Sequence, residues 1–468
     1  MRKEISRETA IAKAEKYFDN GFFFKDLARR VAYPTESQNK DRVSELRDYL
    51  EKEIWPYLEK MGFTCRIVEN PIIDRIPSLI AQRVEDETLP TVLTYGHGDT
   101  VWGMESAWRP GLEPWRLAKE GDRWYGRGAA DNKGQHTINL AALNLLLRER
   151  GELGFNVKIL IEMGEEMGSP GLHEICAQEK DALMADVLIA SDGPRINPDK
   201  PTVFGGSRGV FNFDISLKLR EGEHHSGNWG GLLANPGIIL AHAISSMVDS
   251  RGRILIEGLR PDGIPEPIQK ALAELEVTGA QGPDIDVDWG EPGLSLAEKV
   301  YGWNTLDVLA FECGNPANPV HAIPSSAWAR CHIRYVAGSH PQGFIAAVRK
   351  HLEEHGLEQI QITEIENQYG MATRLSPDNP WVKWTIGSFE KTTDKKTAFL
   401  PNLGGTLPND AFTDILGLPT IWVPHSYGGC SQHAPNEHLL APIAREGLRL
   451  MTGLFWDLAE NPPIDTTD

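Results

Sequence analysis

Five short motifs combine histidine or carboxylate side chains with turn-forming neighbours. They are Gly96-His97-Gly98-Asp99, Ala130-Asp131-Asn132-Lys133, Gly164-Glu165-Glu166-Met167, Ser191-Asp192-Gly193 and Gln432-His433-Ala434. Imidazole and carboxylate groups together suit zinc, cobalt or manganese. We predict one metal ligand from each motif, namely His97, Asp131, Glu166, Asp192 and His433. Because five such ligands are more than one catalytic zinc usually takes, we expect two divalent ions.

Two further acidic residues lie beside the predicted ligands. Asp99 follows His97 by two positions on extended backbone, so both side chains face the same side. A carboxylate placed there can hold a metal-binding imidazole in one tautomer. Glu165 and Glu166 are adjacent at the end of an apolar run and point in different directions. Glu166 can therefore bind a cation while Glu165 stays free as a general base.

Each motif also has a simpler structural explanation. Asp131 stands just before a helix expected over 134–149 and could cap it. A lone histidine in a Gly/Pro-rich loop, such as His433, is more often a surface residue than a ligand. Only the combination of the five motifs indicates a metal site.

The motifs follow elements that could bring them together. Apolar runs at 91–95, 157–161 and 187–190 predict buried strands, and 134–149 has the apolar spacing of a helix. Strands that alternate with helices predict an α/β fold with a mixed, largely parallel sheet. Such sheets bind ligands at the carboxyl ends of their strands, and three of the motifs lie there.

The pattern changes after residue 207. Strands are expected at 210–219, 307–313, 326–336 and 358–365, with helices at 236–248 and 341–355. This β-α-β-β-α-β order is typical of a ferredoxin-like α+β domain. An irregular insertion of unknown role is expected at about 250–305. We therefore predict a catalytic domain made of residues 1–207 and 374–468, and an inserted domain made of residues 208–373.

Composition limits the partners and the compartment. The chain has 468 residues and a net charge of −19, which disfavours binding to nucleic acid or to an anionic membrane. No apolar run approaches the roughly 18 residues of a spanning helix, and the polar start gives no secretory signal. The five cysteines are scattered and lack C-x-x-C spacing. Reduced thiols in a cytoplasmic protein fit this pattern.

In these motifs and their order, nearly the whole chain resembles the dinuclear-zinc amidohydrolases. This family includes carboxypeptidase G, acetylornithine deacetylase, succinyl-diaminopimelate desuccinylase, aminoacylase-1 and the carnosine-type dipeptidases. The resemblance implies a zinc-exopeptidase-like fold and favours zinc over cobalt or manganese. It also implies that His97 and Asp192 bind one ion, Glu166 and His433 bind the other, and Asp131 bridges them. Glu165 would be the general base, and Asp99 would orient His97.

The resemblance extends to the inserted domain and to substrate contacts. The inserted domain looks like the family's lid and dimerisation domain, so a homodimer is expected. His225 in Glu223-His224-His225-Ser226-Gly227 would reach across the dimer to the substrate carbonyl. Arg334, together with Gly405 and Thr406 of Gly404-Gly405-Thr406, would hold a substrate carboxylate. Hinges near 205–209 and 369–375 would let the lid open and close.

The expected activity is metal-dependent hydrolysis of an amide bond in small substrates with a free carboxylate. A dipeptidase or carboxypeptidase is favoured, with an N-acyl or N-carbamoyl amino-acid amidohydrolase as the alternative. A catalytically inactive binding protein of the same fold is a further alternative, but such a protein should have lost ligands or the base. The loop His433-Ala434-Pro435-Asn436-Glu437 departs from dipeptidases that have Ser-Gln between His and Asn. The side-chain preference therefore cannot be transferred from any one relative.

Overall fold

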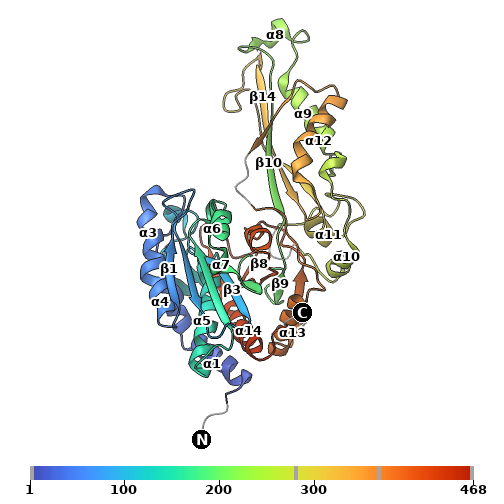
Figure 1. The fold of residues 1–468 in the computed structure, drawn as a ribbon. Coiled ribbons are helices and arrows are strands. Elements are labelled where there is room, and N and C mark those ends of the chain that lie inside the picture. The colour runs from blue at the N-terminus through green and yellow to red at the C-terminus, as the bar shows by residue number, and fades with distance from the viewer. Residues whose placement is uncertain (1–4, 279–282, 366–369, 464–468) are drawn as a thin grey trace.

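The computed structural model describes residues 5–278, 283–365 and 370–463. A large α/β body carries an elongated arm (Figure 1). An eight-stranded sheet of order β1-β2-β6-β3-β7-β17-β9-β16 forms the centre of the body. Its strands are β1 (Thr64–Val68), β2 (Ser78–Arg83), β3 (Thr91–His97), β6 (Asn156–Glu162), β7 (Val187–Ala190), β9 (Thr202–Phe204), β16 (Ala398–Leu400) and β17 (Thr420–Trp422). β6, β3, β7 and β17 are parallel neighbours, so the predicted mixed, largely parallel sheet is confirmed.

Helices cover both faces of this sheet. Along β6, Ile159 and Ile161 face one apolar core and Leu160 faces the other, as the two-residue period of a strand requires. The first core is covered by α1 (Arg7–Asp19), α2 (Phe22–Val31), α5 (Lys133–Arg150), α13 (Pro380–Thr392) and α14 (Ala441–Glu460). The second is covered mainly by α6 (Leu172–Gln178) and the π-helical turn Ala411–Ile415. No helix in the described part of the chain is long and apolar enough to cross a membrane.

Smaller elements complete the body. Residues 40–59 form the 3-10 turn Lys40–Arg42, α3 (Val43–Asp48), the π-helix Tyr49–Ile54 and α4 (Trp55–Glu59). α7 (Lys180–Leu183) follows α6, and short 3-10 turns cover Glu105–Ala107 and Glu165–Met167. One minor sheet contains β4 (Ala118–Glu120), β5 (Arg123–Tyr125) and β19 (His438–Leu440). Another pairs β8 (Pro194–Arg195) with β18 (Ser426–Tyr427).

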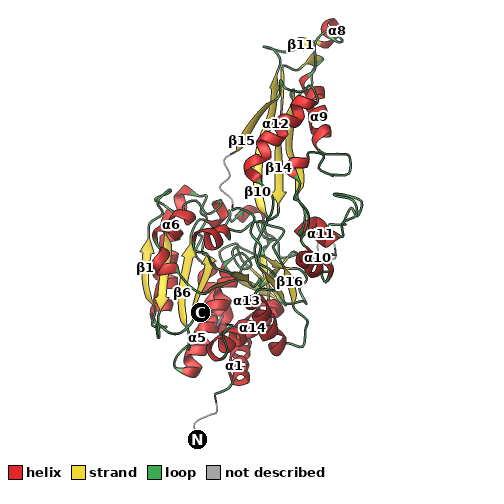
Figure 2. Ribbon diagram, turned by 45° about the vertical axis from the view of Figure 1, so that its right-hand side comes forward, coloured by secondary structure: helices red, strands yellow, loops and turns green. Residues whose placement is uncertain are grey.

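The arm has a four-stranded antiparallel sheet of order β12-β14-β10-β15. Its elements follow the chain as β10 (Gly209–Lys218), α9 (Pro236–Met247), β12 (Thr305–Cys313), β14 (Ser326–Tyr335), α12 (Phe344–Glu354) and β15 (Gln361–Ile365). This is the predicted ferredoxin-like arrangement. Figure 2 shows these strands running along the length of the arm. α9 and α12 pack on one face, where Phe213, Leu240 and Phe344 are fully buried.

The arm leaves and rejoins the body through two adjacent segments. The backbone N–H of Thr373 donates to the carbonyl of Ser207 at 2.9 Å. The body sheet contains β9, which precedes the arm, and β16 and β17, which follow it. The domain limits at 207/208 and 373/374 and the two hinges stay predictions. Residue 369 of the second expected hinge lies outside the described residues.

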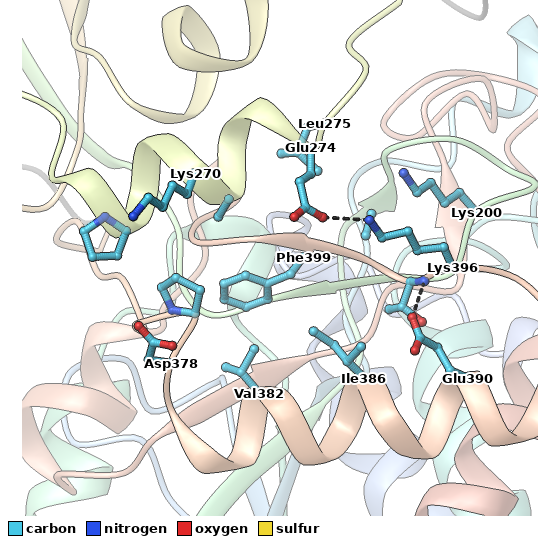
Figure 3. Close-up of a pocket in the computed structure, with 15 residues that line it drawn as sticks. Lys200, Lys270, Glu274, Leu275, Asp378, Val382, Ile386, Glu390, Lys396 and Phe399 are labelled. Atoms are coloured by element: carbon cyan, nitrogen blue, oxygen red, sulfur yellow. Dashed lines mark hydrogen bonds and ion pairs between the residues drawn. The ribbon is translucent and has the colours of Figure 1, made fainter.

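The insertion at 250–305 is more ordered than the expected irregular chain. It contains the 3-10 turn Glu257–Leu259, α10 (Glu266–Ala273) and α11 (Leu296–Tyr301). α11 begins at a capping box formed by Ser295 and Glu298, a local signal that the broad irregular pattern obscured. α10 lies over a 370 Å³ cavity with α13 and Phe399 on its other side, and Lys396 pairs with Glu274 at 2.9 Å (Figure 3). The insertion therefore connects the arm with the body.

Candidate metal centre

Neighbouring strand ends bring the predicted site residues together. His97 is the last residue of β3, and Asp192 lies two residues after β7. Glu165 and Glu166 form the 3-10 turn that follows β6. Since β6, β3 and β7 are parallel neighbours, these side chains meet at one edge of the sheet.

Asp131 lies between the two histidines of the cluster. Its Oδ1 is 3.2 Å from His97 Nε2, and its Oδ2 is 3.1 Å from His433 Nε2. His433 Nε2 is also 3.0 Å from Glu166 Oε2, and His97 Nε2 is 3.6 Å from Asp192 Oδ2. All five predicted ligands therefore belong to one cluster, with Asp131 in the position of a bridge.

The simpler explanations for Asp131 and His433 do not describe their positions. α5 begins at Lys133 with Asn132 as its N-cap residue, and no side chain among the described residues caps the helix. The side chain of His433 is 57% exposed, but its ring contacts both Asp131 and Glu166. His433 also has a φ of 57°, which is uncommon for a residue other than glycine. The loop thus holds this histidine against the acidic cluster.

Buried carboxylates give the cluster an excess of negative charge. Burial and the charge of Asp131 raise the pKa of Glu166 to about 7 and that of Asp192 to about 6. Burial raises the pKa of Glu165 well above its usual value. Hydrogen bonds to Asp131 and Glu166 raise the pKa of His433 to about 11. Protons therefore partly neutralise the cluster when no cation is bound.

The donor set fits divalent cations. Ligand atoms of His97, Asp131 and Glu166 all lie within 4.8 Å of one another. Asp192 Oδ2 is buried and has no hydrogen-bond partner among the described residues. An unpaired buried carboxylate oxygen is costly unless a cation or a proton satisfies it. Imidazole nitrogen and carboxylate oxygen are the ligand types that zinc takes in catalytic sites.

Asp99 does more than face His97. Its Oδ1 lies 3.3 Å from His97 Nδ1, as the sequence predicted for an orienting carboxylate. The backbone N–H groups of Glu165 and Glu166 also donate to its two oxygens, each at 3.2 Å. Asp99 is fully buried. It therefore fixes the histidine and the acidic turn relative to each other. Glu165 Oε2 lies 3.9 Å from His97 Nε2, at the side of the cluster.

Glu437 is a positioning residue that sequence reasoning missed. Its carboxylate is 1% exposed and accepts from Arg127 Nη1 at 2.8 Å. It also accepts from the backbone N–H groups of Gly128, Ala130 and Asp131, at 3.0, 2.9 and 3.0 Å. The residue thus ties the His433 loop to the loop that carries Asp131. The only available signal was an acidic residue four positions after His433, which does not reveal a partner about 300 positions away.

Arg334 and the 404–406 loop lie together at the base of the arm. Arg334 Nη1 donates to Thr406 Oγ1 at 2.5 Å, and Thr406 Oγ1 donates to the carbonyl of Arg208 at 2.7 Å. The Arg208 N–H donates to the carbonyl of Gly405 at 3.1 Å. The predicted carboxylate contacts are therefore close to one another, and Arg208 belongs to the same group.

His225 lies apart from this cluster within the chain. It belongs to the short strand β11 (His224–His225), which pairs with β13 (Ala322–Ile323). The helical turn α8 (Ser226–Trp229) follows directly, at the far end of the arm from the body (Figure 1). His225 is exposed, and its Nδ1 accepts the N–H of Gly227 at 3.1 Å. Within one chain, the structure does not bring His225 to the predicted ligands.

This combination of a buried imidazole–carboxylate cluster, an α/β sheet edge and an inserted arm defines a class of metal-dependent hydrolase. Comparison with known proteins then identifies the family. The model of Peptidase family M20/M25/M40 matches residues 93–457, and the chain belongs to this family. It is therefore an enzyme that uses divalent metal to hydrolyse peptide bonds, and the predicted family resemblance is confirmed.

Individual relatives agree with this assignment. Beta-Ala-His dipeptidase of Rattus norvegicus is 33% identical over 408 residues, covering 82% of this chain and 80% of the relative. Cys-Gly metallodipeptidase DUG1 of Saccharomyces cerevisiae is 24% identical, covering 94% and 96%. The structure of an M20 family metallo-carboxypeptidase from Sulfolobus solfataricus matches with a TM-score of 0.77 and 25% identity, covering 94% and 99%. Human carnosine dipeptidase 1 shares the fold, with a TM-score of 0.75, 22% identity and coverage of 97% and 100%.

Proposed function

We propose that this protein is a dipeptidase that holds two zinc ions through His97, Asp131, Glu166, Asp192 and His433. The observation that carries the proposal is the placement of Asp131 between His97 and His433, with one oxygen toward each ring. Relatives named as dipeptidases that cover most of the chain support the substrate class. In this assignment His97 and Asp192 would hold one ion, Glu166 and His433 would hold the other, and Asp131 would contribute to both.

The chemistry divides between the ions and the chain. Two bound zinc ions supply Lewis acidity and lower the pKa of a water molecule toward neutrality. Glu165 would take a proton from the water that attacks the amide carbonyl, and would pass it to the nitrogen of the leaving amine as the C–N bond breaks. Burial raises the pKa of Glu165 well above its usual value, which favours uptake of a proton by this carboxylate.

Substrate length is limited by the carboxylate contacts. Arg334, Gly405 and Thr406 hold the free carboxylate of the substrate, which places the scissile bond at a fixed distance from the metal centre. A charged guanidinium with a neighbouring hydroxyl suits a carboxylate. Substrates without a free carboxylate are expected to bind poorly.

A homodimer would complete the site. β12 is an edge strand of the arm sheet, and its Leu309 and Phe311 are 59% and 45% exposed. An exposed apolar edge strand favours pairing with a second chain. Such a dimer would carry His225 of one chain to the carbonyl oxygen of a substrate bound by the other. The five unpaired cysteines support a reducing compartment, and we place the enzyme in the cytoplasm.

The proposal is tested with purified, zinc-loaded protein and a panel of dipeptides, their C-terminal amides and N-acyl amino acids. Dipeptides with a free carboxylate should be hydrolysed fastest. Glu165→Gln should keep its zinc content and lose about 100- to 10,000-fold in kcat. Glu152→Gln, an exposed glutamate that follows α5, is the matched control and should behave as wild type. A Glu165→Gln variant with full activity, or hydrolysis confined to N-acyl amino acids, would contradict the proposal.

A further inference from the structure

The insertion builds a second cavity, beside the base of the arm. The cavity has a volume of about 530 Å³ and is lined by residues of the insertion, by the start of β12 and by Arg208. None of the predicted metal ligands lines it, and neither does Arg334. Pockets of several hundred Å³ are the usual size of small-molecule sites.

One wall is a strap formed by residues 285–291. Ile285, Val287 and Trp289 of the strap are 38%, 65% and 53% exposed, so this short segment presents three large apolar side chains to solvent. Yet the strap is held in place. Lys299 Nζ donates to the carbonyls of Val287 and Trp289 at 2.9 and 2.7 Å. The N–H of Gly290 donates to the carbonyl of Arg251. These contacts keep the strap over the cavity.

The cavity has apolar walls and unpaired polar atoms. Ile254 and Leu306 contribute buried apolar surface, and the two indoles of Trp289 and Trp303 also line it. Two buried donors, Arg208 Nη1 and Trp303 Nε1, have no hydrogen-bond partner among the described residues. One buried acceptor, Glu291 Oε2, is also unpaired in the described part of the chain. A ligand that satisfied these three atoms would remove their desolvation cost.

The charges around the cavity indicate the class of ligand. Positive groups come from Arg208 and Lys299, and negative groups come from Asp286, Asp307 and Glu291. Glu291 is partly compensated, because its Oε1 lies 3.2 Å from Arg253 Nε and only its Oε2 is unpaired among the described residues. A wall with both signs favours a zwitterion over a simple anion or cation. A carboxylate suits the donors of Arg208 and Trp303, whereas an ammonium suits Asp286, Asp307 and the unpaired Oε2 of Glu291. An apolar side chain suits the tryptophans and aliphatic residues.

We infer that this cavity binds a free amino acid with an aromatic or branched apolar side chain, at a site separate from the metal centre. Binding at this cavity would not require the proposed dipeptidase activity. The site would nevertheless adjoin the carboxylate contacts, since Arg208 Nε donates to the carbonyl of Gly404 at 2.7 Å. Arg208 therefore has one face toward each site.

Isothermal titration calorimetry of the metal-loaded full chain with L-phenylalanine tests the inference. We expect saturable binding that Trp303→Phe weakens by about 5- to 10-fold, because one hydrogen bond is lost while the ring remains. Trp289→Ser, at the exposed strap, should weaken binding at least as much and covers the case in which Trp303→Phe misfolds. Trp229→Phe, at the far end of the arm, is the matched control and should bind as wild type. N-acetyl-phenylalanine, which lacks the ammonium, should bind at least about 10-fold more weakly than phenylalanine.

Three results would overturn the inference. The first is the absence of saturable binding by phenylalanine. The second is binding that Arg334→Ala abolishes and that Trp303→Phe and Trp289→Ser leave unchanged, since the amino acid would then occupy the reaction site. The third is equal affinity for phenylalanine and N-acetyl-phenylalanine, which would refute recognition of a zwitterion. Loss of hydrolysis with binding retained would contradict only the proposed function.

Discussion

Replacing Glu437 with glutamine perturbs the metal centre without removing any predicted ligand. The carboxylate accepts two hydrogen bonds at each oxygen, one pair from Arg127 and Gly128 and the other from Ala130 and Asp131. A glutamine keeps one oxygen and presents an NH2 group where the other stood. Two of the four donors would then face this NH2 group, which cannot accept a hydrogen bond from them. The buried guanidinium of Arg127 would also lose its counter-charge.

The magnitude follows from these contacts. Hydrogen bonds to a charged group contribute about 1.5–3 kcal/mol each, so the loss of two should lower the free energy of unfolding by about 3–6 kcal/mol. The loop that carries Asp131 would no longer be fixed. Supporting residues of this kind typically change metal affinity by about 10- to 100-fold, and we expect a loss of that size in Glu437→Gln.

The assay combines thermal unfolding with competition titration of zinc. Glu85→Gln is a matched control, because Glu85 accepts from Arg83 at 3.0 Å and from the N–H groups of Leu153 and Gly154 at 2.8 Å. These hydrogen bonds hold the loop that precedes β6, at the end of this strand away from the predicted metal ligands. Glu85→Gln should reduce stability and leave zinc affinity unchanged. Equal zinc affinity in wild type and Glu437→Gln would refute the positioning role.

Three other outcomes follow from the site. The pKa values of Glu166 and Asp192 are raised to about 7 and about 6, so protons compete with the metal for these carboxylates. Zinc affinity should therefore rise at least about tenfold when the pH is raised from 6 to 7. A zinc titration with no pH dependence would contradict this prediction. Arg334→Ala should raise KM for dipeptides about 10- to 100-fold and leave their C-terminal amides nearly unaffected. His225→Ala mixed with Glu165→Gln should recover about a quarter of wild-type activity, because half of the random dimers contain one complete site; no recovery would place His225 in its own chain's site.

Sequence reasoning worked where local pattern and chain geometry coincide. The apolar runs at 91–95, 157–161 and 187–190 are short and continuous, and His97, Glu166 and Asp192 follow their ends within a few residues. The rule that parallel strands share one edge was then enough to predict their proximity. The order of elements in the arm was also predictable, because the spacing of apolar residues differs between strands and helices.

Features that depend on distant pairings were not predictable. Glu437 has no local signal that points to the loop of Asp131, and the second cavity needs the strap at 285–291 to lie over Ile254 and Leu306. The position of His225 at the far end of the arm follows from the length of β10 and β14, which the motif itself does not encode. α10 is short and has no side-chain cap, whereas α11 begins at the capping box of Ser295 and Glu298 and could have been predicted from it.

Asp99 and Glu437 stabilise the acidic site through hydrogen bonds to the backbone of its loops. Asp131, Glu165, Glu166 and Asp192 meet at one sheet edge, where burial and mutual repulsion raise the pKa of Glu165, Glu166 and Asp192. Asp99 binds the backbone of the acidic turn, and Glu437 binds the backbone of the Asp131 loop. Each therefore offsets the repulsion with hydrogen bonds that need no metal. A cation that enters meets ligands already in position, so little of its binding free energy is spent on ordering the loops.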